Sequence, residues 1–80
     1  MPQGKRFRQL DVRPMLKAGI EPYPEIRKRL EALKPNQGLA ILAPFLPAPL
    51  IEKLGSEGFK SSAERAGSGT WITYFWRGEG

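Results

Sequence analysis

Three charged residues, Asp11, Arg13 and Glu21, lie just ahead of a predicted helix and are the first candidates for chemistry in this sequence. Together they could recognise a cationic or polar group. Two carboxylates support acid–base catalysis only where they flank one pocket. The alternative, which we favour, is structural: Asp11 accepts hydrogen bonds from loop amides and pairs with Arg13, so that a Pro/Gly loop has its backbone groups satisfied.

The composition excludes most catalytic chemistry. The chain of 80 residues contains neither cysteine nor histidine. Thiolate nucleophiles, persulfide carriers, disulfides and histidine bases are therefore excluded, as are the usual ligands of zinc, haem, copper and iron–sulfur clusters. The serines have no histidine to activate them. We expect no enzymatic activity, no cofactor and no metal site.

A basic group, Arg27, Lys28 and Arg29, lies on the predicted helix, and the chain as a whole carries a net charge of +5. Together with the basic N-terminal residues, this group could contact phosphates in a salt-dependent and sequence-independent way. The alternative is a solvated helix face on which Arg27 and Glu31, at i and i+4, form a weak pair. We favour this second interpretation.

The last predicted strand places aromatic residues on both of its faces. Trp71 and Phe75 alternate with Ile72, Tyr74 and Trp76, so one set packs in the core and the other is less than fully buried if helices cover only one side of the sheet. An exposed aromatic strand can stack bases or anchor a protein interface. We rank protein contact or self-association above nucleic acid.

The elements that position these residues can be predicted from the pattern. Residues 7–12 alternate in part and predict a strand, which Arg13-Pro14 ends because the residue before a proline favours extended geometry. Residues 15–20 form a loop in which Gly19 can adopt a positive φ.

A helix then begins at Pro22 and Pro24, since proline is tolerated in the first turn, and Glu25 there complements the helix dipole. Pro35 and Gly38 mark its end. The apolar stripe of this helix is Ile26, Leu30 and Leu33.

The second half of the chain repeats this arrangement. Residues 39–43 are apolar throughout and predict a central strand. A proline-rich junction at 44–47 leads into a short helix with Leu50, Ile51 and Leu54 inward. Residues 59–65 and 70–77 form a hairpin around the glycine-rich segment 66–69.

The predicted order is therefore β-α-β-α-β-β. It indicates an α/β (α+β) two-layer sandwich, in which a four-stranded mixed sheet carries two helices on one face. We expect one domain over residues 7–77, with flexible ends at 1–6 (basic) and 78–80. The longest apolar run, interrupted by prolines, is shorter than the about 20 residues that span a bilayer, and residues 1–8 do not form a signal peptide. We expect a cytoplasmic protein without membrane contact.

The residues Leu10, Asp11, Arg13, Pro22 and Pro24 match a motif of the form L-D-x-R-G-L-x-C-P-x-P. On these residues, and on the order of elements, the chain resembles the TusA/SirA-like sulfur-carrier family, which implies the same two-layer sandwich. The loop before the two prolines is longer here, and Glu21 stands where that family has its persulfide-carrying cysteine. Because a glutamate cannot carry a sulfane sulfur, sulfur transfer is not carried over.

The chain looks closer still to a cysteine-less bacterial branch of small domains of unknown function. The features behind this resemblance are the D-x-R strand, the proline-initiated helix, Pro47-Ala48-Pro49-Leu50 and Gly58-Phe59. It implies no particular activity.

The sequence thus predicts a non-enzymatic binding or adaptor module. It would present the helix start from Glu21 to Glu25 and the aromatic strand to another protein or to a second copy. The alternative function is nucleic-acid binding through the basic helix, the N-terminal arm and stacking aromatics.

Overall fold

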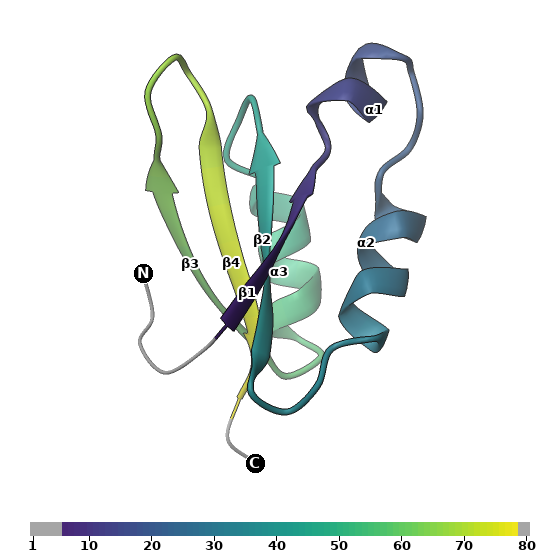
Figure 1. The fold of residues 1–80 in the computed structure, drawn as a ribbon, viewed down its shortest axis with the longest axis vertical. Coiled ribbons are helices and arrows are strands. Elements are labelled where there is room, and N and C mark those ends of the chain that lie inside the picture. Colours follow the sequence, from purple (N-terminus) through teal and green to yellow (C-terminus); the bar gives the residue numbers. More distant parts are fainter. Residues whose placement is uncertain (1–5, 79–80) are drawn as a thin grey trace.

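The computed structural model describes residues 6–78 and contains a four-stranded mixed sheet with three helices (Figure 1). The predictions for residues 1–5 and 79–80 lie outside this part. The elements, in chain order, are β1 (Arg6–Asp11), α1 (Arg13–Lys17), α2 (Tyr23–Glu31), β2 (Gln37–Ala43), α3 (Ala48–Gly55), β3 (Phe59–Arg65) and β4 (Trp71–Arg77). The predicted fold class and the predicted order of elements along the chain are confirmed, except that the structure contains a third helix, α1.

The strands lie in the order β1-β2-β4-β3. β1 and β2 are parallel and adjacent, whereas β4 runs antiparallel to both of its neighbours, β2 and β3. The parallel pair requires a crossover, which α2 supplies, and α3 supplies the second crossover from β2 to β3. Both parallel strands therefore end at the same edge of the sheet, next to the loops that lead into α1 and α3.

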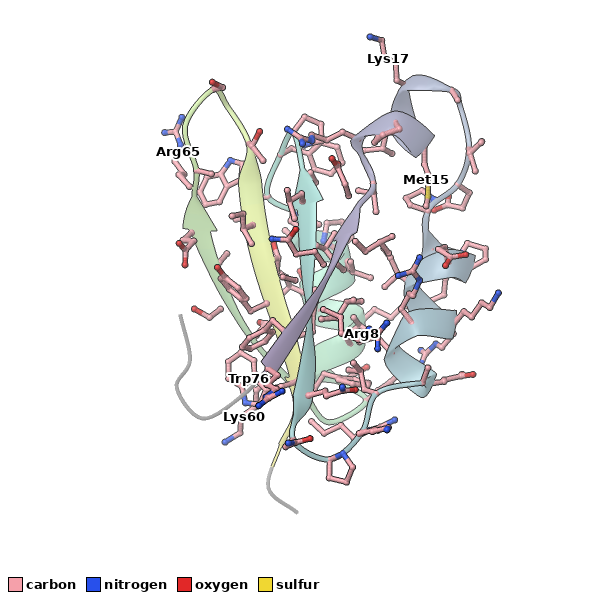
Figure 2. All side chains as sticks on the ribbon, viewed as in Figure 1. Arg8, Met15, Lys17, Lys60, Arg65 and Trp76 are labelled. Carbon is pink, nitrogen blue, oxygen red and sulfur yellow. The ribbon has the colours of Figure 1, made fainter. Side chains whose placement is uncertain are left out.

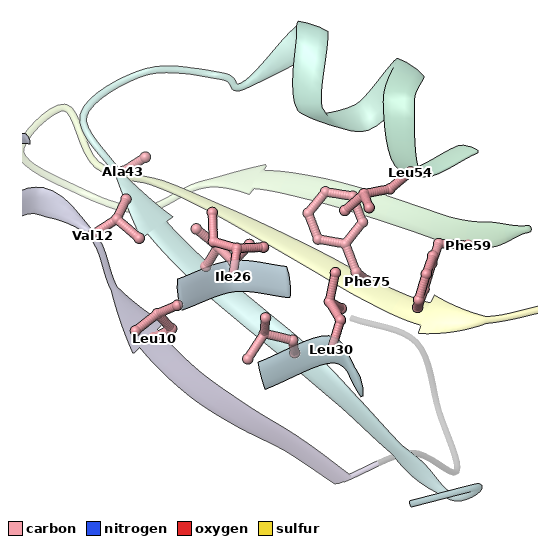
Figure 3. Close-up of a cluster of buried hydrophobic side chains, with 10 residues drawn as sticks. Leu10, Val12, Ile26, Leu30, Ala43, Leu54, Phe59 and Phe75 are labelled. Carbon is pink, nitrogen blue, oxygen red and sulfur yellow. The ribbon is translucent and has the colours of Figure 1, made fainter. Parts of the chain in front are cut away.

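The core lies between one face of the sheet and the helices α2 and α3 (Figure 3). Ile26 and Leu30 of α2 and Leu54 of α3 pack there against Phe75, which is fully buried. The side chains of β2 alternate, with Leu39, Ile41 and Ala43 in this core. On the opposite face of the sheet, called the open face below, no helix formed by residues 6–78 is present (Figure 1).

The prediction of a loop over residues 15–20 is wrong for residues 15–17, because Arg13–Lys17 form the short helix α1. Arg13 is the first helical residue and is not extended, and Pro14 lies in the first helical turn, where its missing N–H costs nothing. Met15 and Leu16 of this helix pack against the core. A helix of this length is not stable by itself, and tertiary packing holds it in place.

The predictions for the other prolines and glycines, at helix starts and in turns, are confirmed. Pro22 is the N-cap of α2, and Pro24 lies in its first turn. Gly19 and Gly58 both adopt a positive φ, at +76° and +94°, where the chain leaves α1 and approaches β3. None of the helices within residues 6–78 is long and apolar enough to cross a bilayer.

Candidate functional site

An apolar groove of about 560 Å³ opens at the edge of the sheet where β1 and β2 end. Its walls come from α2, from α3 and from the loops that precede these helices. Its most buried lining residues are Val12, Ile26, Ile41 and Ala43, each at most 3% exposed. Crevices beyond the carboxyl ends of parallel strands are common ligand sites in α/β proteins.

The rim of the groove is apolar and exposed. Ile20, in the loop between α1 and α2, is 56% exposed, and Phe45, in the loop between β2 and α3, is 50% exposed. Leu46 is next to Phe45 and is 42% exposed, but it does not line the groove. Large exposed apolar side chains on both sides of one groove indicate a surface that buries them against something else.

Three polar side chains line the groove, namely Glu21, Tyr23 and Lys53. A carboxylate oxygen of Glu21 accepts a hydrogen bond from the backbone N–H of Tyr23 at 3.2 Å, at the first residue of α2. The ring of Tyr23 is in cation–π contact with Lys53 of α3, whose ammonium nitrogen lies 5.6 Å from the ring centroid. Tyr23 therefore contacts both helices that wall the groove.

Arg27 provides a second contact between these two helices. Its guanidinium donates to the Tyr23 hydroxyl at 2.8 Å and forms an ion pair with Glu57, which follows α3. The hydrogen bond that Arg27 donates to Glu57, and next the one that it donates to Tyr23, raises the pKa of Arg27 above its usual value. The sequence predicted a pair with Glu31, and this is wrong, because Arg27 turns toward α3.

The predicted pair of Asp11 and Arg13 is present. The Arg13 side chain donates to both carboxylate oxygens of Asp11, at 2.8 and 2.7 Å, and its backbone N–H donates to one of them at 3.0 Å. The side-chain hydrogen bond from Arg13 is the main cause that lowers the pKa of Asp11. Arg13 also donates to the Thr70 hydroxyl at 3.0 Å, which ties the end of β1 to the β3–β4 hairpin. Glu21 instead lines the groove.

The basic group on α2 is partly neutralised. Arg29 forms an ion pair with Glu25, one turn earlier, at 2.7 Å, and this contact lowers the pKa of Glu25. Arg27 is paired with Glu57, as described above. Lys28 is exposed on the outer face of the helix. Two of the three cations of this group are therefore paired with carboxylates of the same chain.

The two faces of β4 are now distinguished. Phe75, a tentative binding residue, is fully buried in the core and cannot contact a partner, so the set that contains Phe75 is the one that packs inward. Trp71 belongs to the same alternating set and is half-buried, with the Arg65 guanidinium 5.7 Å from its ring centroid. The other set lies on the open face, where Ile72 and Trp76 (Figure 2) are half-buried and Tyr74 is only 7% exposed.

The sequence interpretation missed the groove and its rim. Ile20 and Phe45 were assigned to loops, where no periodic pattern gives an apolar residue a partner. A useful signal was nevertheless present, because each of them lies a few residues before a proline that begins a helix. Large apolar residues in two such loops, at the ends of adjacent parallel strands, predict a shared apolar opening.

Residues 6–78 contain no group of three or more carboxylate, histidine or cysteine side chains that could hold a metal ion. Neither the curated proteins nor the solved structures contain a match to this chain. A family model described as "Uncharacterized conserved protein (DUF2249)" matches residues 9–77, which include every helix and nearly every strand residue of the fold. The chain belongs to this DUF2249 family.

Proposed function

We propose that this protein is a non-enzymatic binding module that holds a short apolar segment of a partner protein in the groove between α2 and α3. The observation that carries the proposal is the exposed apolar rim, formed by Ile20 and Phe45 on opposite loops. The absence of cysteine and histidine removes the common catalytic groups and leaves contact as the function.

The rim favours a protein segment over a small molecule. The groove volume alone does not decide, because about 560 Å³ lies within the range of small-molecule pockets. A small ligand inside the groove would leave the outer halves of Ile20 and Phe45 in water. A protein segment that crosses the opening would cover both of them, as the apolar centre of a protein interface does.

The expected energy is that of a modest interface. Full burial of a large apolar side chain contributes roughly 1.5–3 kcal/mol. Because Ile20 and Phe45 are about half exposed, covering each of them would contribute about 1 kcal/mol. An anchor side chain that enters the groove itself would add about 1.5–3 kcal/mol, so that the total of about 3.5–5 kcal/mol corresponds to a dissociation constant of about 0.2–3 mM.

The resemblance to the TusA/SirA-like sulfur carriers supports the groove as the binding site. The order of elements and the proline-initiated helix agree with that family, and Glu21 stands at the position of its carrier cysteine. Glu21 lines the groove. In this proposal the chain keeps a carrier-like scaffold and uses this position for contact, without sulfur transfer.

Nucleic-acid binding is the second candidate, and the net charge of +5 favours it. Against it, Arg13, Arg27 and Arg29 are each engaged by a carboxylate of the same chain. Binding of labelled single-stranded oligonucleotides at low salt tests this alternative, since an electrostatic complex is strongest there.

The groove can be tested with a displayed library of short peptides. We expect the enriched peptides to carry at least two large apolar residues, and to shift the backbone amide resonances around Ile20, Ile26 and Phe45 in NMR titrations. Phe45→Ser should weaken binding about fivefold, the equivalent of about 1 kcal/mol. Leu46→Ser is the matched control, because Leu46 is exposed nearby but does not line the groove.

The following outcomes would contradict this proposal. Equal losses in the two variants, or peptide-induced shifts confined to the open face of the sheet, would contradict the groove as the docking site. Enrichment of peptides without apolar residues would contradict the proposed chemistry.

A further inference from the structure

Among the described residues that line the apolar groove, Lys53 is the one cation. It is an exposed residue of α3, and its ammonium nitrogen lies 5.6 Å from the centroid of the Tyr23 ring. The ion pairs between described residues involve Arg13, Arg27 and Arg29, and none of them involves Lys53. Lys53 is therefore positioned by an aromatic ring, while its charge has no carboxylate beside it.

Two cations share the Tyr23 ring, and they differ in this respect. The Arg27 guanidinium lies 5.7 Å from the ring centroid and is paired with the carboxylate of Glu57. An aromatic face attracts a cation through its quadrupole, but the ring carries no net charge. The positive charge of Arg27 is therefore balanced within the chain, and that of Lys53 is not.

Glu21, the carboxylate that lines the groove, does not balance Lys53. It belongs to the loop before α2, and one of its oxygens accepts the backbone N–H of Tyr23 at 3.2 Å. A negative charge next to the start of α2 is also stabilised by the helix dipole. A segment bound in the groove therefore meets a negative charge on the α2 side and a positive charge on the α3 side.

We propose that the segment bound in the groove carries a carboxylate, from an aspartate or a glutamate, that pairs with Lys53. This inference rests on the proposed function and specifies the sequence of the partner. A segment that covers the groove removes water from the Lys53 ammonium. An apolar group placed there would leave a desolvated charge unpaired, which is unfavourable, whereas a carboxylate compensates for the lost water.

The place of the carboxylate in the segment follows from α3. Leu50 and Lys53 both line the groove and are three residues apart in this helix, so their side chains are neighbours about 5–6 Å apart. In an extended segment, alternate side chains point to the same side and are separated by about 6.5 Å. The carboxylate therefore lies two residues from the large apolar residue that covers Leu50.

The ion pair is a partly exposed one, and it adds modestly to the apolar contacts. Exposed ion pairs change an equilibrium constant by up to about fivefold. We expect a segment with the carboxylate to bind about threefold more tightly than the same segment with an amide in dilute buffer. This difference should shrink as salt is raised to about 1 M, because salt screens the attraction.

Two synthetic hexapeptides with blocked ends test the proposal. Each has leucine at its first position, phenylalanine at its third, either aspartate or asparagine at its fifth, and serine elsewhere. A second pair with the reverse order of residues allows for a segment that runs in the opposite direction. NMR titration of the full chain gives the dissociation constants, and in one of the two orders wild type should bind the aspartate peptide about threefold more tightly.

Variants of Lys53 connect this preference to one side chain. Lys53→Met removes the charge but keeps an unbranched side chain, so the preference should disappear while the asparagine peptide binds within about twofold of wild type. Lys53→Glu should reverse the preference, because it places two carboxylates together. Lys17→Met is the matched control and should keep the preference, because Lys17 is exposed, points away from the molecule (Figure 2) and does not line the groove. Far-UV circular dichroism confirms that each variant folds.

The results distinguish this inference from the function on which it rests. Equal binding of the aspartate and asparagine peptides by wild type, in both orders, would overturn the inference and leave the groove as the binding site. A preference that is unchanged in Lys53→Met would do the same. If none of the four peptides binds, both proposals fail.

Discussion

Arg27 of α2 forms an ion pair with Glu57, which follows α3, and so joins the two helices that wall the apolar groove. The two residues are separated by 30 positions in the sequence. The same guanidinium donates to the Tyr23 hydroxyl, and the Tyr23 ring in turn contacts Lys53 of α3. The width of the groove therefore depends on a polar network as well as on core packing.

Replacing Glu57 with Gln should loosen this connection. The ion pair is partly exposed, with side-chain exposures of 28% and 34%, so its attraction is screened by salt. We expect a lower Tm for Glu57→Gln than for wild type in dilute buffer, and a difference that shrinks as salt is raised to about 1 M. Thermal unfolding followed by circular dichroism measures it. Equal Tm values in dilute buffer would show that the pair does not hold the helices.

Thr73→Val should stabilise the protein by about 1 kcal/mol. Thr73 is fully buried in the central strand β4, and among the described residues its hydroxyl oxygen has no hydrogen-bond partner. Valine has the same shape, removes the unsatisfied hydroxyl and favours a strand. Urea unfolding gives the free energy of unfolding. A destabilised variant would indicate that the hydroxyl has a partner, and Thr73→Ser, which loses the methyl group instead, should be destabilising.

Gly38→Ala should destabilise the protein by about 2 kcal/mol through overpacking. The added Cβ would lie 2.4 Å from the Phe7 ring and 2.8 Å from the backbone oxygen of Phe75. Phe7 can move, but the backbone oxygen of a central strand cannot. Gly55→Ala is the control, because a Cβ at the end of α3 meets nothing within 4 Å and should be neutral or stabilising. Urea unfolding compares the two variants.

The stability that Asp11 contributes to the folded protein should be lost in acid. Arg13 lowers the pKa of Asp11 in the folded state, so Asp11 contributes stability above its unfolded pKa of about 3.9. This contribution is lost as the pH falls through the lower, folded value. Between about pH 5 and pH 2, the free energy of unfolding of Asp11→Asn should therefore fall less steeply than that of wild type.

The measurement is urea unfolding across this pH range, with the Asp11 carboxyl followed by NMR. A folded-state titration midpoint at or above about 3.9 would contradict the lowered pKa. Glu25, whose pKa Arg29 lowers, contributes a slope of the same sign in both proteins, so the difference between them isolates Asp11.

The sequence by itself determined the order of the elements and the absence of the common catalytic groups. Prolines and glycines mark helix starts and turns through their own backbone constraints, so Pro22, Pro24, Gly19 and Gly58 could be interpreted one at a time. The pair of Asp11 and Arg13 was also predictable, since it spans two positions and serves the adjacent loop. The lack of cysteine and histidine follows directly from the composition.

The tertiary structure alone decided which residues meet. Both faces of β4 are aromatic, so only the placement of α2 and α3 decides that Phe75 is buried and that Trp76 lies on the open face. Packing against the core also makes α1 a helix, and it turns Arg27 toward Glu57 instead of Glu31. The groove unites Ile20 and Phe45 because two parallel strands end at one edge of the sheet. Such contacts depend on which distant segments pack together, and a local pattern carries no information about that choice.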